Sequence, residues 1–456
     1  MNAGRSLPDG TVVAFYGDDF TGSSASMEAL AFAGLDTVLF LAPPSAARLA
    51  RFRHYRGIGI AGVARSRSPA WMDEHLPPIF VLLQAVGAPV VHYKVCSTFD
   101  SAPEVGSIGR AAELGARVFD GWIPLIVGEP GMGRFQSFGH LFALAHGQGY
   151  RLDRHPVMAR HPVTPMGEAD LGLHLARQTA LPVGLVDFVA IKRGAGEVAL
   201  DAALGAGARI VSIDVLDEET LAEAGRLVWE RGGRPCFAIG SQGVEAALVA
   251  HWRQAGQLPP APTIRAADRV ARIAVVSGSV SPVTARQISA AASAGFAPIR
   301  LDAEHAIDAR NWQAGLEAAQ RQALAALDSG ASPLVFTASG PDDPAVARLR
   351  AAVAASGLSA ETVNDRIGEG LGALLDGVLR SARLTRAVIS GGDTSSHAAA
   401  KLGIDALTAI APMAPGSPLC RAHAEAPDRD GLELVLKGGQ VGGDDFFSEV
   451  REGGAP

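Results

Sequence analysis

The chain has little of three features that would point to whole classes of protein. Its three cysteines, Cys96, Cys236 and Cys420, are far apart and lack metal-ligand spacing, so they indicate neither a disulfide framework nor a zinc site. No stretch reaches the roughly 18 apolar residues of a membrane span, and no continuous apolar segment precedes the first motif. The sequence therefore predicts a protein of the reducing cytoplasm that does not enter a membrane.

Positive charge is also scarce. The formal net charge is -7, and no basic run with interleaved aromatics occurs, which argues against nucleic acid as a partner. Among the 40 basic residues only Lys94, Lys192, Lys401 and Lys437 are lysines. Where arginine serves nearly everywhere, a retained lysine favours a role for a compact point charge.

What the chain does have is length and a regular alternation of elements. Its 456 residues exceed the roughly 250 to 300 that one core accommodates. Short apolar runs alternate with alanine-rich helical stretches, which is typical of parallel sheets covered by helices. The alternation breaks at "QLPPAPTIRAADR". The predicted fold is α/β, with two α/β domains of mainly parallel sheet at 1–256 and 270–456, a linker at 257–269, and the active site in the interdomain cleft.

The predicted C-terminal domain has three strands that run into glycine-rich loops: "VVSGSVSPVT", "VISGGDTSS" and "LVLKGGQVGGDD". Glycines let the backbone approach an anion, and N–H groups at a helix start carry partial positive charge. One such loop alone would be an ordinary tight turn. Three together, with Lys437 directly before "GGQVGG", predict a phosphate or nucleotide site. Asp393 either holds Mg²⁺ through water or caps the next helix.

Two common nucleotide fingerprints are missing or misplaced. No G-x-x-x-x-G-K-[ST] occurs, so the chain is not a P-loop NTPase. A formal G-x-G-x-x-G at Gly57, Gly59 and Gly62 lies inside the apolar run "GIGIAGVA" and opens no helix. The dinucleotide motif requires the strand to end before its glycines, so a dehydrogenase is disfavoured.

In the predicted N-terminal domain, "GDDFTG" follows the strand "TVVAFY". In parallel sheets ligands bind beyond the carboxyl ends of strands, which is where Asp18 and Asp19 lie. Asp19 or Thr21 could cap the following helix. Two adjacent acids exceed what a cap needs, and the excess indicates proton or cation handling.

Two further loops carry groups that suit an anion. Arg65 and Ser66 lie in "ARSRSP", where an arginine fork suits a carboxylate, although such a loop is as often a solvated rim. Lys94 and Ser97 lie in "HYKVCSTFDS", and Lys94 interrupts a strand that is otherwise apolar. A lysine in that setting favours an anion site.

Taken together, these stretches resemble the four-carbon acid-sugar kinase family. The family's order is kept by "GDDFTGSS" (17–24), "ARSRSP" (64–69), "YKVCSTFDS" (93–101), "HPVTPMGEADL" (161–171), "SGSVSPVTARQI" (277–288), "SGGDTSS" (390–396) and "KGGQVGGDDFF" (437–447). The resemblance implies an ATP-dependent kinase whose N-terminal domain binds a small acid sugar and whose C-terminal domain binds the nucleotide. A homo-oligomer stays open.

The resemblance also assigns residues by position. The acid-sugar side receives Asp18, Asp19, Arg65, Ser66, Lys94 and Ser97. The nucleotide side receives Ser279, Gly391, Gly392, Asp393, Thr394, Gly439 and Gly442, to which Lys437 is added from its place beside a glycine loop.

The lysine motif bears on the substrate. It has the form K-x-C-S-T-F-D-S, with Cys96 and Asp100, which is similar to members that act on 3-oxo-tetronates instead of threonate or erythronate. The chain departs from the family at Ala25, where many members carry an aspartate, and at Gly17, where alanine is usual. A kinase of a related acid sugar (branched 3-oxo-isoapionate, threonate or erythronate) is therefore an alternative, as is a non-catalytic sensor of acid sugar and nucleotide.

Phosphoryl transfer needs alignment, charge neutralisation and a group near the attacking hydroxyl. The working hypothesis is that the glycine loops and Lys437 hold ATP with Mg²⁺. Arg65, Lys94 and Ser97 would grip the substrate, and Asp18 or Asp19 would orient or deprotonate its hydroxyl.

Overall fold

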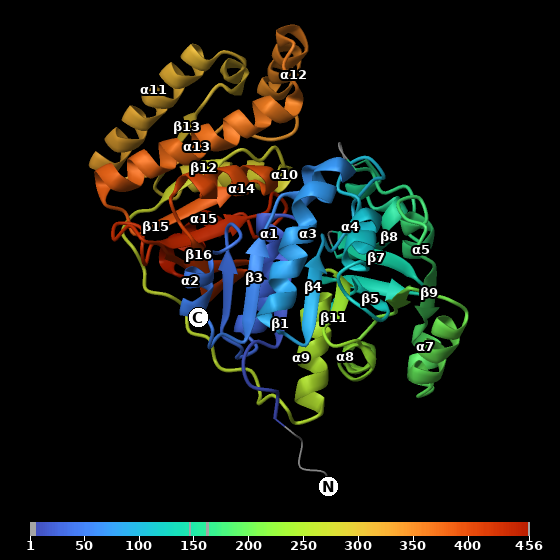
Figure 1. Ribbon diagram of the computed structural model, residues 1–456. Coiled ribbons are helices and arrows are strands. Elements are labelled where there is room, and N and C mark those ends of the chain that lie inside the picture. Colours follow the sequence, from blue (N-terminus) through green and yellow to red (C-terminus); the bar gives the residue numbers. More distant parts are fainter. Residues whose placement is uncertain (1–5, 146, 161–163, 455–456) are drawn as a thin grey trace. The chain divides into compact units, whose positions relative to one another are not determined.

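A computed structural model of the chain describes residues 6–145, 147–160 and 164–454 (Figure 1). The chain divides into two compact units. The first comprises Met1–Val38 and Pro43–Pro262, and the second comprises Leu39–Ala42 and Thr263–Pro456. Among the described helices none is long and apolar enough to cross a membrane.

The first unit is built on a parallel sheet. Its strands are ordered β3-β1-β4-β11-β5-β10-β9, and each pairs in parallel with its neighbours. The central strands are buried along their whole length, which explains why their sequences are continuously apolar. The strands are β1 (Val13–Gly17), β3 (Gly57–Ala61), β4 (Val90–Lys94), β5 (Ile123–Ile126), β9 (Val183–Val186), β10 (Ile210–Ile213) and β11 (Cys236–Gly240).

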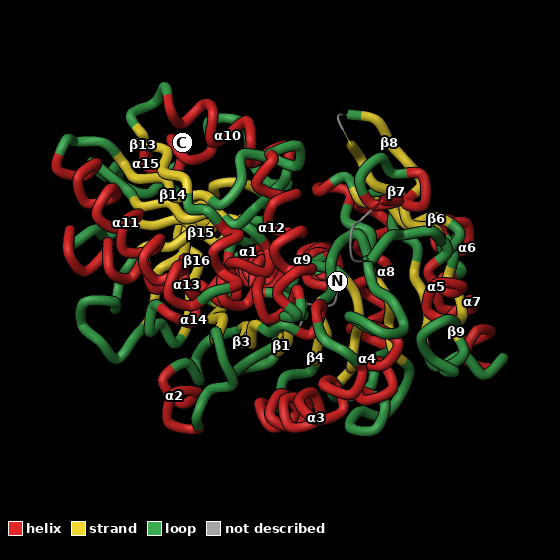
Figure 2. The backbone as a smooth tube through the Cα atoms, turned by 90° about the horizontal axis from the view of Figure 1, so that it is seen from above, coloured by secondary structure: helices red, strands yellow, loops and turns green. Residues whose placement is uncertain are grey.

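Helices cover both faces of this sheet. Met72, Leu76 and Phe80 of α3 and Ile108 of α4 pack against strand side chains in one core cluster. Figure 2 shows α1, α8 and α9 on the opposite side of these strands from α3 and α4. The helices are α1 (Phe20–Ala31), α2 (Ala46–Arg51), α3 (Pro69–Val86), α4 (Ile108–Gly115), α5 (Leu171–Leu175), α6 (Phe188–Lys192), α7 (Gly196–Gly205), α8 (Glu218–Arg231) and α9 (Gly243–Gln254), with 3₁₀ turns η1 (Ala64–Ser66), η2 (Pro130–Met132), η3 (Leu152–Arg154) and η4 (Met158–Arg160).

A second, smaller sheet in this unit was not predicted from the sequence. It is antiparallel and consists of β6 (Arg134–Ser137), β7 (His140–Ala145) and β8 (Gln148–Arg151). The buried carboxylate of Asp214, just beyond β10, accepts hydrogen bonds from the N–H groups of Phe138 (2.5 Å) and Gly139 (2.9 Å) in the β6–β7 turn. This contact attaches the small sheet to the large one.

The second unit has its own sheet, in the order β13-β14-β12-β15-β18-β17-β16. The first five strands are parallel, and β17 and β16 are antiparallel additions. Leu39 and Phe40, from the end of β2 (Thr37–Phe40), pair with Leu407 and Ala406 of β16. The strands are β12 (Ala274–Ser277), β13 (Phe296–Arg300), β14 (Ser332–Phe336), β15 (Arg386–Ser390), β16 (Ala406–Ala414), β17 (Ser417–His423) and β18 (Glu433–Lys437).

In the described part of this unit six helices accompany these strands, and three of them follow a strand as the sequence pattern predicted: α10 after β12, α12 after β14 and α14 after β15. The predicted α/β class with mainly parallel sheets is thereby confirmed. The helices are α10 (Pro282–Ala292), α11 (Ala309–Asp328), α12 (Pro344–Ser356), α13 (Ala360–Ala382), α14 (Gly392–Lys401) and α15 (Phe446–Glu452), with the 3₁₀ turn η5 (Ala303–Ile307).

The rejected G-x-G-x-x-G motif has a packing role. Gly57 and Gly59 lie within β3, and Gly62 follows its end. A Cβ atom at Gly59 would overlap the ring of Phe15, and one at Gly62 would overlap the ring of Tyr16. Gly59 and Gly62 thus make room for aromatic side chains of β1, and the motif does not form a phosphate loop.

Candidate functional site

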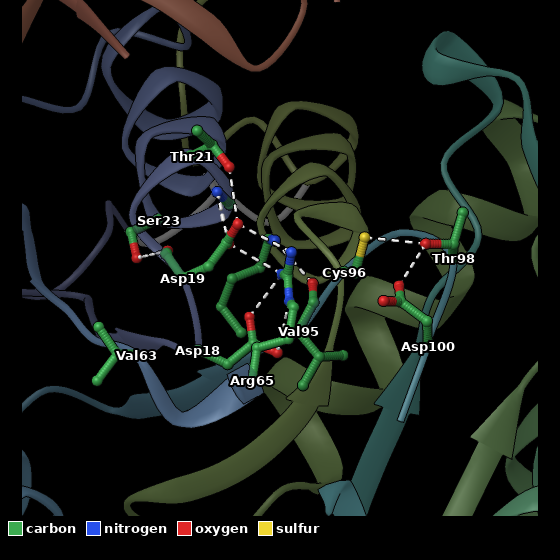
Figure 3. Close-up of polar contacts among 12 residues, drawn as sticks. Asp18, Asp19, Thr21, Ser23, Val63, Arg65, Val95, Cys96, Thr98 and Asp100 are labelled. Carbon is green, nitrogen blue, oxygen red and sulfur yellow. Dashed lines mark hydrogen bonds and ion pairs between the residues drawn. The ribbon is translucent and has the colours of Figure 1, made fainter. Parts of the chain in front are cut away.

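Two buried aspartates lie at the carboxyl end of β1. Asp18 is 3% exposed and Asp19 is 5% exposed. Asp19 is the N-cap of α1: its Oδ1 accepts from the N–H of Gly22 (2.7 Å) and its Oδ2 from the hydroxyl of Thr21 (2.7 Å) (Figure 3). The capping role considered from the sequence therefore belongs to Asp19, and Asp18 is the acid in excess of a cap.

Arg65 holds both aspartates. It lies in η1, which follows β3, and β3 pairs with β1 so that Ala61 is opposite Gly17. Its Nη2 contacts Asp18 Oδ1 at 2.7 Å and its Nη1 contacts Asp19 Oδ2 at 2.8 Å (Figure 3). Its Nε donates to Asp18 Oδ2 at 3.3 Å, and Nη2 donates also to Asp19 Oδ1 at 2.9 Å. The Arg65 guanidinium was expected to face a substrate carboxylate, but it binds the carboxylates of Asp18 and Asp19 instead.

The electrostatics of this cluster favour proton transfer at Asp18. Burial raises the pKa of Asp18 to about 6, although Arg65 lowers it, and the neighbouring charge of Asp19 raises it further. The two carboxylates outweigh burial at Arg65 and hold its pKa well above the ordinary value. A carboxyl group that exchanges its proton near neutral pH is suited to general acid–base chemistry.

Lys94 completes the cluster from the end of β4. It is 1% exposed, and its Nζ donates to the carbonyl of Val95 at 2.7 Å. A Cβ atom at Gly22, in the first turn of α1, would lie 2.8 Å from Lys94 Nζ and 3.4 Å from Arg65 Nη2, and would overlap Asp19 Oδ1. Gly22 therefore leaves open the space on which an ammonium, a guanidinium and a carboxylate converge.

The structure does not bring the two predicted serines into this cluster. Ser66 is exposed, and its hydroxyl donates to the carbonyl of Val63 at 3.1 Å. Ser97 is half-buried and makes no hydrogen bond with the other described residues. Beside it, Cys96 Sγ lies 2.9 Å from the hydroxyl of Thr98, which donates to Asp100 at 2.6 Å (Figure 3). Substrate contacts of Ser66 and Ser97 stay predictions.

One buried pair of hydrogen-bonded side chains, formed by a residue of β4 and a residue of α9, was not predicted from the sequence. His92 and Glu245 have side chains that are 0% exposed, and His92 Nδ1 lies 2.6 Å from Glu245 Oε1. Glu245 Oε2 also accepts from the hydroxyl of Ser26 at 3.0 Å, and His92 Nε2 lies 3.1 Å from the carbonyl of Gly240. The pair links β4, β11 and α9 to α1, the helix that carries Asp19 and Gly22.

In the second unit, the loop after β18 lies beside the loops after β12 and β15. The N–H of Gly391 donates to the carbonyl of Lys437 (2.9 Å), and the N–H of Gly278 donates to that of Ser390 (3.0 Å). Lys437 is 0% exposed, and its Nζ donates to Gly438 O (2.9 Å) and to Thr284 Oγ1 (3.3 Å). Burial lowers the pKa of the Lys437 ammonium to about 7.

Several other predicted residues of this unit lie in the loops that follow β12, β15 and β18. Ser279 is 8% exposed, and its Oγ accepts from Thr284 Oγ1 at 3.0 Å. A Cβ atom at Gly439 would lie 2.9 Å from Ser279 Oγ. Gly391 has φ 122° and precedes α14, which begins at Gly392, and Gly442 has φ 86° in the loop after β18. These positive φ angles favour glycine.

Some predicted residues fall where the structure gives no side-chain description. The side chains of Asp393 and Thr394 lie outside the described residues, as do residues 161–163 of the "HPVTPM" motif. Within the part of the chain that the structure describes, no three His, Cys, Asp or Glu side chains are grouped so that they could hold a metal ion. A divalent ion that arrives on nucleotide phosphates needs only one or two protein carboxylates.

Comparison with known proteins places these two clusters in two known domains. A sugar-binding N-terminal domain family matches residues 13–248, which include the Asp18, Asp19, Arg65 and Lys94 cluster. A nucleotide-binding C-terminal domain family matches residues 274–447, which include Lys437 and the glycine loops.

Whole proteins align over nearly the full length. A 3-oxo-isoapionate kinase of Paraburkholderia graminis is 52% identical over 98% of this chain and 95% of its own. A 3-oxo-tetronate kinase of Methylobacterium radiotolerans is 31% identical over 95% of this chain and 97% of its own. The crystal structure of Haemophilus influenzae protein HI1011, assigned to the family DUF1537, aligns with a TM-score of 0.67 and 25% identity over 95% of this chain and 98% of its own.

These matches confirm the resemblance seen in the sequence motifs. Both domains occur in the expected order, and full-length relatives are acid-sugar kinases. The chain therefore belongs to the four-carbon acid-sugar kinase family, whose members are phosphotransferases built from these two domains.

Proposed function

We propose that this chain is an ATP-dependent kinase that phosphorylates a hydroxyl group of 3-oxo-isoapionate. The choice of substrate is supported by the difference in sequence identity to two relatives. The chain is 52% identical to a 3-oxo-isoapionate kinase and 31% identical to a 3-oxo-tetronate kinase, over nearly the whole chain in both. The lysine motif alone predicted 3-oxo-tetronate. Sequence identity over the full length is stronger support for 3-oxo-isoapionate as the substrate than one motif is for 3-oxo-tetronate.

In the first unit, we assign the proton acceptor to Asp18. Both carboxylate oxygens of Asp19 already accept bonds from the α1 cap, Thr21 or Arg65. Among the described residues, the Asp18 carboxylate accepts hydrogen bonds from Arg65 alone, and one of these is long at 3.3 Å. The pKa of Asp18 is raised to about 6. Lys94 supplies the positive charge for the substrate carboxylate, because Arg65 is engaged by the aspartates.

In the second unit, we assign the ATP phosphates to the loops around Lys437. Backbone N–H groups at the start of α14, the glycines after β18 and the Lys437 ammonium are the donor types that phosphate oxygens need. Mg²⁺ bound with ATP would neutralise charge on the phosphates. Asp393 and Thr394 at the start of α14 stay predicted contributors.

The proposal is tested by ADP release from the whole chain, with 3-oxo-isoapionate, 3-oxo-tetronate, threonate and erythronate as acceptors. We expect kcat/KM for 3-oxo-isoapionate to exceed that for 3-oxo-tetronate by at least about 10-fold, because a site shaped for a branch loses contacts with an acceptor that lacks it. A preference for 3-oxo-tetronate would restore the motif-based prediction. Binding of ATP and acid sugar without ADP release would identify a sensor.

A second prediction concerns protons taken up with ATP. Lys437 is buried next to neutral partners, and its pKa of about 7 leaves it mostly uncharged above that pH. A polyphosphate favours the charged form, so ATP binding should raise this pKa. We therefore expect uptake of up to about one proton per ATP at pH 8 and weaker ATP binding as the pH rises above 7.

Calorimetry in two buffers of different ionisation enthalpy measures this uptake. Lys437→Met should abolish it and weaken ATP binding, whereas Lys401→Met should leave both unchanged, since Lys401 is an exposed lysine at the end of α14. Equal proton uptake by the wild-type protein and Lys437→Met would remove Lys437 from the nucleotide site.

A further inference from the structure

A second pair of charged side chains lies at the carboxyl end of β5, outside the Asp18, Asp19 and Arg65 cluster. Glu129 and Arg134 flank the turn η2, and their backbones are joined by two hydrogen bonds: Glu129 N–H to Arg134 O (2.8 Å) and Arg134 N–H to Glu129 O (3.1 Å). The loop is therefore closed at its base. Both side chains project from a fixed piece of backbone.

Each of these side chains has a buried polar atom without a partner. Among the described residues, Glu129 Oε2 and Arg134 Nε are inaccessible to solvent and make no hydrogen bond. The Nη1 of Arg134 donates to the carbonyls of Met132 and Gly133, both at 3.2 Å. An unpaired buried polar group is destabilising by about 1–3 kcal/mol, so two in one loop need a reason.

The loop adjoins the cluster already described. β5 pairs with β11, and β11 pairs with β4, so the carboxyl ends of these strands lie along one edge of the sheet. Gln242, two residues beyond β11, hydrogen-bonds the Glu129 carboxyl, and the charge of Lys94 reaches Glu129. The polar edge that begins at Asp18 thus continues through Lys94 to Glu129 and Arg134.

The chemistry of the two unpartnered atoms is complementary. A carboxylate oxygen accepts hydrogen bonds, whereas a guanidinium N–H only donates. A hydroxyl group does both, so sugar hydroxyls can serve Glu129 and Arg134 together. Burial raises the pKa of Glu129 to about 7, against the hydrogen bond from Gln242, which lowers it, and a hydroxyl donor would lower it further.

We propose that Glu129 and Arg134 bind a non-reacting hydroxyl of the acid sugar and so determine which acid sugar is accepted. The inference rests on the proposed function, since it concerns the same substrate. A branched acid sugar carries a hydroxyl-bearing branch that a straight tetronate lacks. A site built to hydrogen-bond such a hydroxyl rejects the analogue without it, because its own buried groups are then left unpaired.

The alternative use of Glu129 is in a neighbouring groove. Glu129 also borders a groove of about 660 Å³ along α1, α8 and α9, whose lining is mostly apolar and includes Glu218. Glu218 is exposed, so Glu218→Gln is a matched control: it makes the same chemical change in the same groove, at a carboxyl group that is not buried. If Glu129 acted in the groove and not at the strand edge, Glu129→Gln and Glu218→Gln would have the same effect.

The experiment compares kcat/KM for 3-oxo-isoapionate and 3-oxo-tetronate in the wild-type protein, Glu129→Gln and Glu218→Gln. We expect Glu129→Gln to lower kcat/KM for the branched substrate by about 10- to 100-fold, mainly through KM, as for the loss of a hydrogen bond to a charged group. The value for the straight substrate should change little, and KM for ATP not at all. Glu218→Gln should match the wild-type protein.

Arg134→Lys is the second, independent variant. It keeps the positive charge but lacks the Nε–H donor, so it too should reduce the preference for the branched substrate. Thermal unfolding and ATP affinity show whether each variant is folded. An unchanged ratio of the two kcat/KM values in both folded variants would overturn the inference and leave the proposed function standing.

If instead the wild-type protein released no ADP with any acid sugar, the proposed function would fail. Calorimetric titration of 3-oxo-isoapionate into the wild-type protein and Glu129→Gln would then decide the inference by itself. At least about 10-fold weaker binding by Glu129→Gln supports it, and equal binding, or none to either protein, overturns it.

Discussion

Replacing Arg65 by methionine should lower kcat/KM for the acid sugar by about 10²- to 10⁴-fold, the range that a positioned general acid–base group supplies. Arg65 makes four hydrogen bonds to Asp18 and Asp19, which are both buried. Without it two adjacent carboxylates share a buried site, and one of them must take up a proton. The proposed proton acceptor would then already be protonated at neutral pH.

The pH profile separates this cause from a general loss of structure. Arg65 lowers the pKa of Asp18, which is about 6 in the intact protein. Removing that lowering charge should raise the pKa by about 1–3 units, so the acidic limb of kcat/KM should move from near pH 6 to above pH 7. Activity should partly return at high pH.

Arg53→Met, a change at an exposed arginine of the same unit, serves as the control for charge alone and should leave the profile unchanged. Arg65→Lys should recover only part of the activity, because an ammonium cannot reproduce the planar fork that holds two carboxylates. A full rate with an unshifted acidic limb in Arg65→Met would show that the Arg65 contacts do not matter for proton transfer.

The second large effect concerns stability. Glu245→Leu should reduce the free energy of unfolding of the first unit by about 3–5 kcal/mol, because breaking a buried pair leaves the other partner unpaired. His92 would keep its contact with Gly240 O but lose Glu245, and Ser26 would lose its acceptor. His92→Leu should be destabilising to a similar degree.

The double variant is the informative control. Replacing His92 and Glu245 together by leucine leaves neither polar side chain without its partner, and exchanging a buried pair for apolar side chains is often close to neutral. The loss in the double variant should therefore be much smaller than the sum of the single losses.

Denaturant unfolding followed by tryptophan fluorescence reports mainly on the first unit, which contains Trp71, Trp122, Trp229 and Trp252, four of the five tryptophans. If the single losses simply added in the double variant, the two side chains would not act as a pair.

Much of the fold follows from local signals. Continuously apolar runs such as "TVVAFY" become buried parallel strands, because a strand covered on both faces needs apolar side chains at every position. The same logic placed Asp18 just beyond a strand, where the structure finds it, and Lys94 and Lys437 are the last residues of β4 and β18. The small antiparallel sheet β6–β8 was missed, although "RFQSFGHLFALA" has partly alternating polarity.

The pairings within the site could not be predicted in the same way. Arg65 meets Asp18 across 47 positions of the sequence, and only the register of β1 against β3 brings them together. Glu129 is a single acid in "GEPGMG", without a motif around it. Its place just after β5 was the available signal, but the strand order that puts β5 near β4 is a property of the whole sheet.

The path of the chain between the units limits how the protein can be taken apart. The second unit needs Leu39–Ala42, which the sequence places inside the other domain, and Leu39 and Phe40 supply the last strand segment beside β16. A fragment beginning at residue 263 would leave the edge of β16 with unpaired backbone groups, and bare edges invite aggregation. We therefore expect the nucleotide-binding half to stay soluble by itself only if residues 39–42 are supplied with it, so a cut at residue 263 is the wrong place to divide the protein.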